Sequence, residues 1–324
     1  PVAATETIAA AMVLRLVRLL QARQVAAEPL LARAGLSLAA LQPSAARVTY
    51  AATDQLLEAA AEQLGANGLG LTLAQTRSDE SYGAAGLLLV TGSTFRQGLS
   101  RSLGYQRLWG DGERFALLPV GNDCAVRFRH PGQSRMAGAI AAECALVEVL
   151  EGLRALVEPD AVPLGVDFTH APLGDVEVLA DHFGVVPRFE QAENRIVLPT
   201  HLVNRPMHAF RDLIGAALER QAARALSLLP AKDSMVARVQ PLLADEQGLS
   251  RSLADVAEAL RVSSRTLQRR LRQEQSSFEQ LVDEARQTQA LALERLGTPA
   301  KEIAFRLGFQ DPSALSRARR RWRK

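Results

Sequence analysis

The sequence has little of what disulfide-stabilised or membrane-spanning proteins require. Its 324 residues include only two cysteines, Cys124 and Cys144, and 5% aromatic residues. Two cysteines favour packed thiols in a reducing compartment over a disulfide framework. The longest apolar runs, such as residues 86–90, fall far short of the about 20 residues that a membrane-spanning helix needs. The first residues also lack the charged-then-apolar pattern of a secretion signal. We therefore expect a cytoplasmic protein with no membrane partner.

Groupings of residues typical of catalysis or metal binding are missing too. His201 and His208 are close in sequence, but Pro206 interrupts any common helix, and no cysteine or carboxylate completes a metal-ligand spacing. The glycine-containing segment GANGLGL lacks the Gly-Lys-Ser/Thr of a phosphate-binding loop, so we interpret it as an ordinary loop. We predict no catalytic residues, no metal and no cofactor, and therefore a protein that is not an enzyme.

Charge is distributed unevenly along the chain. The formal net charge is +3, but residues 245–324 hold 16 Lys and Arg against 11 Asp and Glu, whereas the rest of the chain holds 22 against 24. The excess of basic residues is therefore C-terminal, and the last residues, SRARRRWRK, concentrate it. Such a cluster favours a polyanionic partner, with a merely solvated basic surface as the alternative.

The rest of the composition is that of a globular, largely helical protein of about two domains. Hydrophobic residues make up 48% of the chain, mostly Leu, Ala and Val. Apolar periodicity predicts helices in the N-terminal part, over residues 6–25, 53–65, 137–157 and 205–228. The second of these is expected to be capped by Thr53 or Asp54. The segments RFALLPV and CAVRFRH predict two paired strands around the turn GND.

Two stretches of the C-terminal part, SLADVAEALRVSSRTLQRRLR and EIAFRLGFQDPSALSRARRRW, have matching patterns of apolar residues. Ala257 precedes the turn residue Val262 by five positions, and Ala304 precedes the turn residue Phe309 by the same interval. A small residue at this place lets two helices cross closely, as a helix-turn-helix requires. We therefore predict two helix-turn-helix units.

Capping residues and a connecting helix agree with this prediction. Ser263 can cap the second helix of the first unit, and Asp311 followed by Pro312 can begin that of the second. Residues 278–296 predict a helix between the units, about 28 Å long. The fold class we predict is mainly α, with an α+β domain over residues 1–230 and an all-α domain over residues 231–324.

The outer face of each second helix is left free by this arrangement. Arginine can contact guanine bidentately, glutamine can contact adenine, and serine can contact phosphate or base. The predicted DNA-binding residues are Ser264, Arg265, Gln268, Arg269 and Arg272 on the first unit and Ser313, Ser316, Arg317 and Arg320 on the second. Arginines so close together repel one another on an isolated helix, and the phosphates of double-stranded DNA would compensate for that repulsion. The alternative is a basic helical bundle with no DNA partner.

The C-terminal region resembles the AraC/XylS family of bacterial transcription regulators. The resemblance is carried by DVAEALRVSSRTLQRRLR, by the intervening helix, and by EIAFRLGFQDPSALSRARRRW with its LGF-x-D motif. It implies that the paired second helices read DNA, through Arg265, Gln268, Arg269, Ser316 and Arg317. Two departures stand out: Arg319 takes the place of a core Phe of the family, and the chain ends at Lys324, short of the usual extension.

The N-terminal region is similar to the effector domain of an AraC subgroup that includes ornithine- and arginine-responsive regulators. The similarity rests on GLLLVTGSTFRQGLSRSLGYQRL, VDFTHAPLGD and HFGVVPRFEQAENRIVLPTHLVNRPM. It implies an arabinose-binding-domain-like sensing domain, without indicating the effector or the residues that bind it.

The helix predicted over residues 205–228 carries an apolar stripe. The stripe is formed by Met207, Phe210, Ile214 and Leu218. It either covers the core of its own domain or forms the two-fold contact of a homodimer.

The favoured function is sequence-specific transcriptional regulation, with activation as the favoured mode. A small-molecule effector bound to the N-terminal domain would control it, with promoter DNA, a second copy of the chain and RNA polymerase as partners. Two alternatives remain open. One is a constitutive DNA-binding protein whose N-terminal domain only oligomerises, and the other is an enzyme domain fused to a DNA-binding tail.

Overall fold

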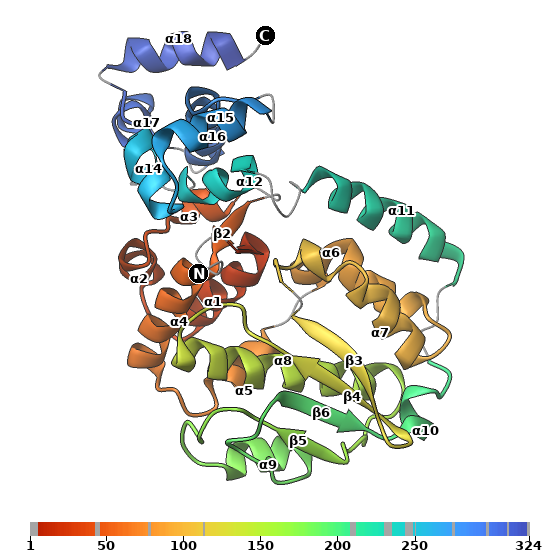
Figure 1. Cartoon of the computed structure of the whole chain (residues 1–324). Helices are drawn as coiled ribbons and strands as arrows, with labels where there is room; N and C mark the ends of the chain where they lie inside the picture. The colour runs from red at the N-terminus through yellow and green to blue at the C-terminus, as the bar shows by residue number, and fades with distance from the viewer. Residues whose placement is uncertain are drawn as a thin grey trace. The chain divides into compact units, whose positions relative to one another are not determined.

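The computed structural model of the chain describes most of its length (Figure 1). The described residues are 6–42, 46–76, 79–112, 114–207, 212–229, 235–243, 249, 251–273, 276–295, 298–309 and 311–322. Helices predominate, and a small antiparallel sheet lies in the N-terminal part, which confirms the predicted fold class. Within these ranges, no helix is long and apolar enough to cross a membrane.

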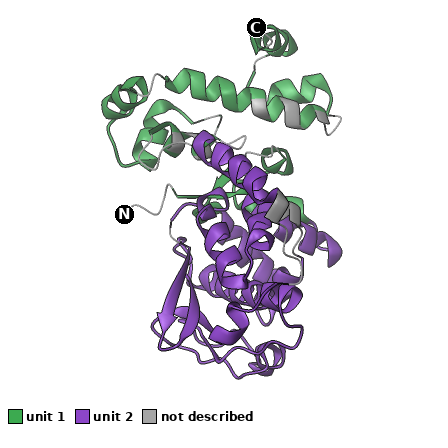
Figure 2. Ribbon diagram, turned by 90° about the vertical axis from the view of Figure 1, so that its right-hand side faces the viewer, with its two compact units in different colours: residues 1–10, 27–52, 229–324 green, residues 11–26, 53–228 purple. Residues whose placement is uncertain are grey.

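The chain forms two compact units (Figure 2). Unit 1 comprises residues 1–10, 27–52 and 229–324, and unit 2 comprises residues 11–26 and 53–228. Unit 1 thus groups N-terminal segments with the C-terminal residues, and the division into contiguous domains at residue 230 stays a prediction.

Unit 2 contains a four-stranded antiparallel sheet. Its strands, in spatial order, are β3 (Phe115–Val120), β4 (Asp123–Phe128), β6 (Asn194–Leu198) and β5 (Gly165–Asp167). Val120 pairs with Asp123, so two residues make the hairpin turn. Gly121 has a φ of 59° in this turn, a value that glycine adopts without strain. The predicted pair of strands is confirmed.

The helix α8 (Arg135–Leu156) packs on β4 and β6 and is the central helix of unit 2. Its other side contacts α5 (Leu69–Gln75), which begins inside the segment predicted as a loop. The other helical segments of the unit are α1 (Ala10–Ala22), α4 (Tyr50–Leu64), α6 (Asp79–Leu87), η2 (Leu88–Thr91), α7 (Phe95–Leu103), η3 (Gln106–Leu108), α9 (Glu177–Phe183), α10 (Thr200–Val203) and α11 (Asp212–Leu228); α1 and α4 have their first residues in unit 1.

The predicted starts of three helices were wrong. Residues Thr7–Ala9, expected to be helical, form a strand, and α1 begins at Ala10. Helix α4 begins at Tyr50, and Asp54 lies inside it as a buried carboxylate. That carboxylate pairs with the ring of His130 and accepts hydrogen bonds from the backbone of residues 133 and 134. A tertiary contact therefore takes the side chain that was expected to cap the helix.

The helix predicted from residue 205 is described only from Asp212, as α11. Pro206 forms an isolated β-bridge with Thr94, and the Met207 N–H donates to the carbonyl of Ser93. These contacts hold both residues outside any helix, and residues 208–211 lie outside the described part of the chain.

A buried ion pair joins α1 to α8. The guanidinium of Arg15 is 4% exposed and donates to the carboxylate of Glu148, to the Tyr82 hydroxyl at 3.0 Å and to the Leu73 carbonyl at 3.0 Å. Tyr82 also donates to Glu148. Burial raises the pKa of the Tyr82 hydroxyl well above its usual value, and the charge of Glu148 adds to the effect, so the hydroxyl remains a donor.

Unit 1 combines short N-terminal elements with the C-terminal helices. The N-terminal elements are β1 (Thr7–Ala9), α2 (Ala27–Arg33), α3 (Leu38–Leu41) and β2 (Arg47–Thr49), and the two strands pair antiparallel. The C-terminal elements are α12 (Met235–Val239), η4 (Gln240–Leu243), α14 (Leu253–Ala259), α15 (Ser264–Gln273), α16 (Phe278–Arg295), α17 (Ala300–Arg306) and α18 (Pro312–Trp322). Ala39 of α3 packs in one apolar cluster with Leu293, Ile303 and Leu315.

Helices α14–α15 and α17–α18 form two helix-turn-helix units with matching turns. The Val262 N–H donates to the Ala257 carbonyl at 2.9 Å, and the Phe309 N–H donates to the Ala304 carbonyl at 2.9 Å. One residue in each turn has positive φ, at 54° for Arg261 and at 72° for residue 308, a glycine. Backbone geometry therefore confirms the repeat that the apolar pattern predicted.

The predicted caps and cores of both units are confirmed as well. The Ser263 hydroxyl accepts from the Thr266 N–H at 3.1 Å, and the Asp311 carboxylate accepts from the Ala314 N–H at 2.8 Å. The first core consists of Met235, Val239, Leu243, Val256, Ala257, Leu260, Leu267, Leu271 and Leu281. The second consists of Ala39, Leu249, Ala290, Leu293, Ile303, Ala304, Leu307 and Leu315. Val282 and Ala285 of α16 pack against both, so this helix links the two units.

Candidate nucleic-acid interface and buried pocket

The second helix of the first unit, α15, separates apolar from basic residues. Leu267 and Leu271 face the core and are fully buried. The predicted DNA-binding residues Arg265, Gln268, Arg269 and Arg272 are exposed, and Ser264 is half-buried. Because the leucines fix the orientation of the helix, the polar side chains lie together on its outer face.

The second helix of the other unit, α18, has the same organisation. Leu315 and Ala318 are buried, and the predicted residues Ser313, Ser316, Arg317 and Arg320 are exposed. The hydroxyl of Ser316 donates to the Pro312 carbonyl at 3.1 Å, so its oxygen is left as an acceptor. The predicted residues of α18 therefore lie together on its outer face.

Ion pairing distinguishes two groups of arginines in these units. Arg306, Arg319 and Arg321 pair with Glu302, Glu294 and Asp283. The exposed arginines of the two outer faces pair with no carboxylate in the part of the chain that the structure describes; they are Arg265, Arg269, Arg272, Arg317 and Arg320. These unpaired positive charges can bind an external anion without first breaking an internal ion pair.

Arg319 stands where the resemblance expects an aromatic core residue. Its side chain is half-buried, and its guanidinium pairs with Glu294 of α16. The Nε atom is buried and has no hydrogen-bond partner among the described residues. The guanidinium thus pairs with a carboxylate of the neighbouring helix.

We expect Arg319→Phe to raise the free energy of unfolding by about 1 kcal/mol. The aromatic ring would add buried apolar area and remove the buried, unpartnered Nε–H, and the ion pair that is lost is partly exposed and of small value. Urea denaturation of the full chain measures this, with Arg320→Phe at the exposed neighbouring position as the control. Unchanged or lower stability would show that the position is not a core position here.

The connecting helix α16 has 18 residues, and so a length of about 27 Å at 1.5 Å per residue. Successive major-groove faces on one side of a duplex are roughly 34 Å apart. Simultaneous insertion of α15 and α18 into adjacent grooves stays a prediction that this length supports.

The described residues predicted for dimerisation differ in their exposure. Met207 is buried, Ile214 is 43% exposed and Leu218 is half-buried. Phe210 lies outside the described residues. Ile214 is thus the member of this set whose exposure suits a contact with another chain.

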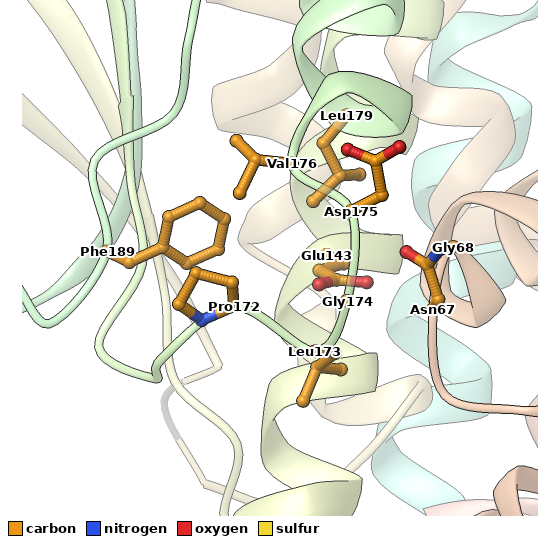
Figure 3. Close-up of a pocket in the computed structure, with 10 residues that line it drawn as sticks. All are labelled: Asn67, Gly68, Glu143, Pro172, Leu173, Gly174, Asp175, Val176, Leu179 and Phe189. Atoms are coloured by element: carbon orange, nitrogen blue, oxygen red, sulfur yellow. The ribbon is translucent and has the colours of Figure 1, made fainter.

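A small cavity in unit 2 is lined by residues that the sequence did not single out (Figure 3). Its volume is about 10 Å³. The lining residues are Asn67 and Gly68 before α5, Glu143 of α8, the loop Pro172, Leu173, Gly174, Asp175 and Val176, Leu179 of α9, and Phe189.

Glu143 is the buried acidic group of this cavity. It is 1% exposed, and burial raises the pKa of its carboxyl to about 8. Helix α5 approaches it closely, because a Cβ added at Gly70 would lie 2.5 Å from the Glu143 Cβ. The sequence did contain a signal for this site: a glutamate within the apolar run AIAAECALV, at a position where the other residues predict burial on every side.

Comparison with known proteins extends over nearly the whole chain. The family model described as the arabinose-binding domain of AraC transcription regulators, N-terminal, matches residues 25–207, and a helix-turn-helix domain model matches residues 256–324. The ornithine utilization regulator of Pseudomonas aeruginosa is 27% identical over 279 residues, which cover 85% of this chain and 82% of that protein. The HTH-type transcriptional regulator VirS of Mycobacterium tuberculosis is 26% identical over 276 residues, 83% of this chain and 79% of that protein. A crystal structure of the transcriptional regulator CdpR from Pseudomonas aeruginosa aligns with a TM-score of 0.45 and 21% identity, over 95% of this chain and 93% of that one.

Proposed function

The chain belongs to the family of AraC transcription regulators with an arabinose-binding N-terminal domain, and from this premise we propose which of its residues read DNA. It is a DNA-binding transcriptional regulator with an N-terminal effector domain. We propose that α15 and α18 enter the major groove, with Arg265, Gln268 and Arg269 contacting bases from the first unit and Ser316 and Arg317 from the second. The observation that carries this assignment is the set of exposed arginines on both outer faces that pair with no carboxylate among the described residues.

We expect Gln268→Ala or Arg269→Ala to weaken specific DNA binding by about 1–3 kcal/mol, because each removes a bidentate contact with a base. Binding to random-sequence duplex should change little. Fluorescence anisotropy with promoter and scrambled duplexes of equal length measures both affinities. Arg272→Ala and Arg320→Ala are the matched controls: if these side chains contact phosphate, they weaken binding to both duplexes and lower the salt dependence by about one phosphate each. Equal loss on both duplexes for the position 268 and 269 variants would show that these residues contact only phosphate.

We propose that a small-molecule effector bound to unit 2 controls DNA binding, and that the protein acts as an activator with RNA polymerase as a further partner. A relative is named for ornithine utilization, so ornithine is the first compound to test. Run-off transcription with purified RNA polymerase, with and without the compound, tests both parts. A constant transcript level with every compound would favour the alternative of a constitutive DNA-binding protein.

We propose that the protein is a homodimer and that the exposed side of α11 contributes to the contact. Ile214 and Leu228 are exposed apolar residues of this helix, whereas Ala222 is buried. A two-fold contact would place two DNA-binding regions on one promoter, so affinity should depend on half-site phasing.

The expected effect of Ile214→Asp is loss of this phasing dependence, because a buried unpaired carboxylate disfavours the contact. Sedimentation of the full chain and binding to duplexes with half-sites moved by half a helical turn measure the effect. Arg220→Asp, at an exposed polar position of the same helix, is the control. A wild-type protein that sediments as a monomer on and off DNA would rule out the homodimer.

A further inference from the structure

Glu143 is a buried acidic side chain of unit 2. Its Oε2 atom is buried and has no hydrogen-bond partner among the residues that the structure describes. A buried carboxyl without a partner destabilises a domain, since it has lost its hydrogen bonds to water. Such a group calls for an explanation, and one explanation is a ligand that completes its hydrogen bonds.

The walls around Glu143 combine acceptors with apolar surface. In Figure 3 its carboxyl lies between Asn67 and Gly68 on one side and Pro172 and Phe189 on the other. Asp175 supplies a second carboxylate, and no lysine, arginine or histidine is among the lining residues. The cavity therefore combines the Asp175 carboxylate, a buried carboxyl that a bound cation would ionise, and an aromatic side chain, and all three favour a cation.

The size of the cavity limits the kind of cation. A volume of about 10 Å³ admits one water-sized group. A primary ammonium group is of this size, whereas a quaternary ammonium group is not. No set of three or more His, Cys, Asp or Glu side chains suited to a metal occurs in the described ranges, which favours an organic cation. The exposed loop residues Pro172 and Asp175 form the wall that faces solvent.

We propose that this pocket binds the protonated amino group of a small aliphatic amine, with Glu143 as its buried counter-ion. The ammonium hydrogens donate to Glu143 and to the oxygens of Asp175 and Asn67. The cavity admits only the ammonium group, so the alkyl chain extends past its solvent-facing wall, against the exposed Pro172. This inference rests on the proposed function in one respect: it makes such an amine the effector. Binding of the amine itself requires no DNA.

Isothermal titration calorimetry of the DNA-free full chain at pH 7.5 tests the proposal with three probes: n-butylammonium chloride, n-butanol and tetramethylammonium chloride. We expect saturable binding of n-butylammonium, and affinities at least about tenfold weaker for the other two, because one lacks the charge and the other exceeds the cavity. Glu143→Gln, which keeps the shape but cannot ionise when the cation binds, should weaken n-butylammonium binding at least about tenfold. Glu177→Gln is the matched control at an exposed position of α9 that does not line the cavity, and it should bind as the wild type does.

Equal binding of n-butylammonium and n-butanol would overturn the proposal, and so would wild-type affinity in Glu143→Gln or no binding of n-butylammonium at all. Whether the amine regulates DNA binding is measured separately, as promoter affinity with and without the amine. If the amine binds through Glu143 but leaves promoter affinity unchanged, the pocket is correct and its assignment as the effector site is wrong. If the wild-type protein fails to recognise its promoter even without amine, that result contradicts the proposed DNA interface. It does not bear on amine binding, which calorimetry measures without DNA.

Discussion

Arg15→Met is expected to lower the free energy of unfolding by about 3–5 kcal/mol, the largest effect that we foresee for a single substitution. The variant keeps much of the aliphatic volume but leaves the Glu148 carboxylate in the interior without its cation. It also removes the donors to the Tyr82 hydroxyl and the Leu73 carbonyl. An uncompensated buried charge is less favourable than the loss of any one hydrogen bond, so the whole cluster is affected.

Urea denaturation of the full chain, followed by circular dichroism, measures this change. Arg18→Met is the matched control, because Arg18 is an exposed arginine one turn further along α1. It should change stability by no more than about 1 kcal/mol. The double variant Arg15→Met/Glu148→Leu should recover part of the loss, since it removes both charges. A loss below 1 kcal/mol for Arg15→Met would mean that water reaches Glu148.

Glu143→Gln is expected to raise the free energy of unfolding by up to about 3 kcal/mol at pH 7. This increase over the wild type should depend on pH. Burial raises the pKa of this carboxyl in the folded chain from its ordinary 4.5 to about 8, and one pKa unit corresponds to about 1.4 kcal/mol. Below pH 4.5 the carboxyl is protonated in both states and has no effect on this difference. As the pH rises from 4.5 to 8, the unfolded chain releases a proton that the folded chain retains, so the wild type loses stability. Above pH 8 both states are ionised and the loss is complete.

The difference in stability between Glu143→Gln and the wild type should therefore be small near pH 4 and grow steadily toward pH 8. Denaturation at several pH values measures this slope, which a constant contribution from the new amide cannot mimic. Glu177→Gln, at an exposed position, should show no such slope. A difference that stays flat with pH would show that the Glu143 carboxyl is already ionised in the folded protein and has a partner there.

The two helix-turn-helix units are determined by the sequence itself. Their apolar residues recur at helical spacing, and the caps at Ser263 and Asp311 bond within three residues along the chain. The turns are closed by backbone hydrogen bonds between residues five positions apart, such as that from the Val262 N–H to the Ala257 carbonyl. Because all of these interactions are local, residue order alone specifies them, and with them the face that carries Arg265 and its neighbours.

Only the tertiary structure decided which polar residues of unit 2 are buried together. Arg15 and Glu148 are 133 positions apart, and Asp54 bonds residues near 133 in place of its own helix end. Glu143 lies in a pocket because Gly70 and the loop around Asp175 close over α8. No periodicity along the chain records these contacts, since each depends on how distant segments pack. The proposed DNA-reading face was therefore predictable from residue order, whereas the candidate effector site exists only where three distant segments meet.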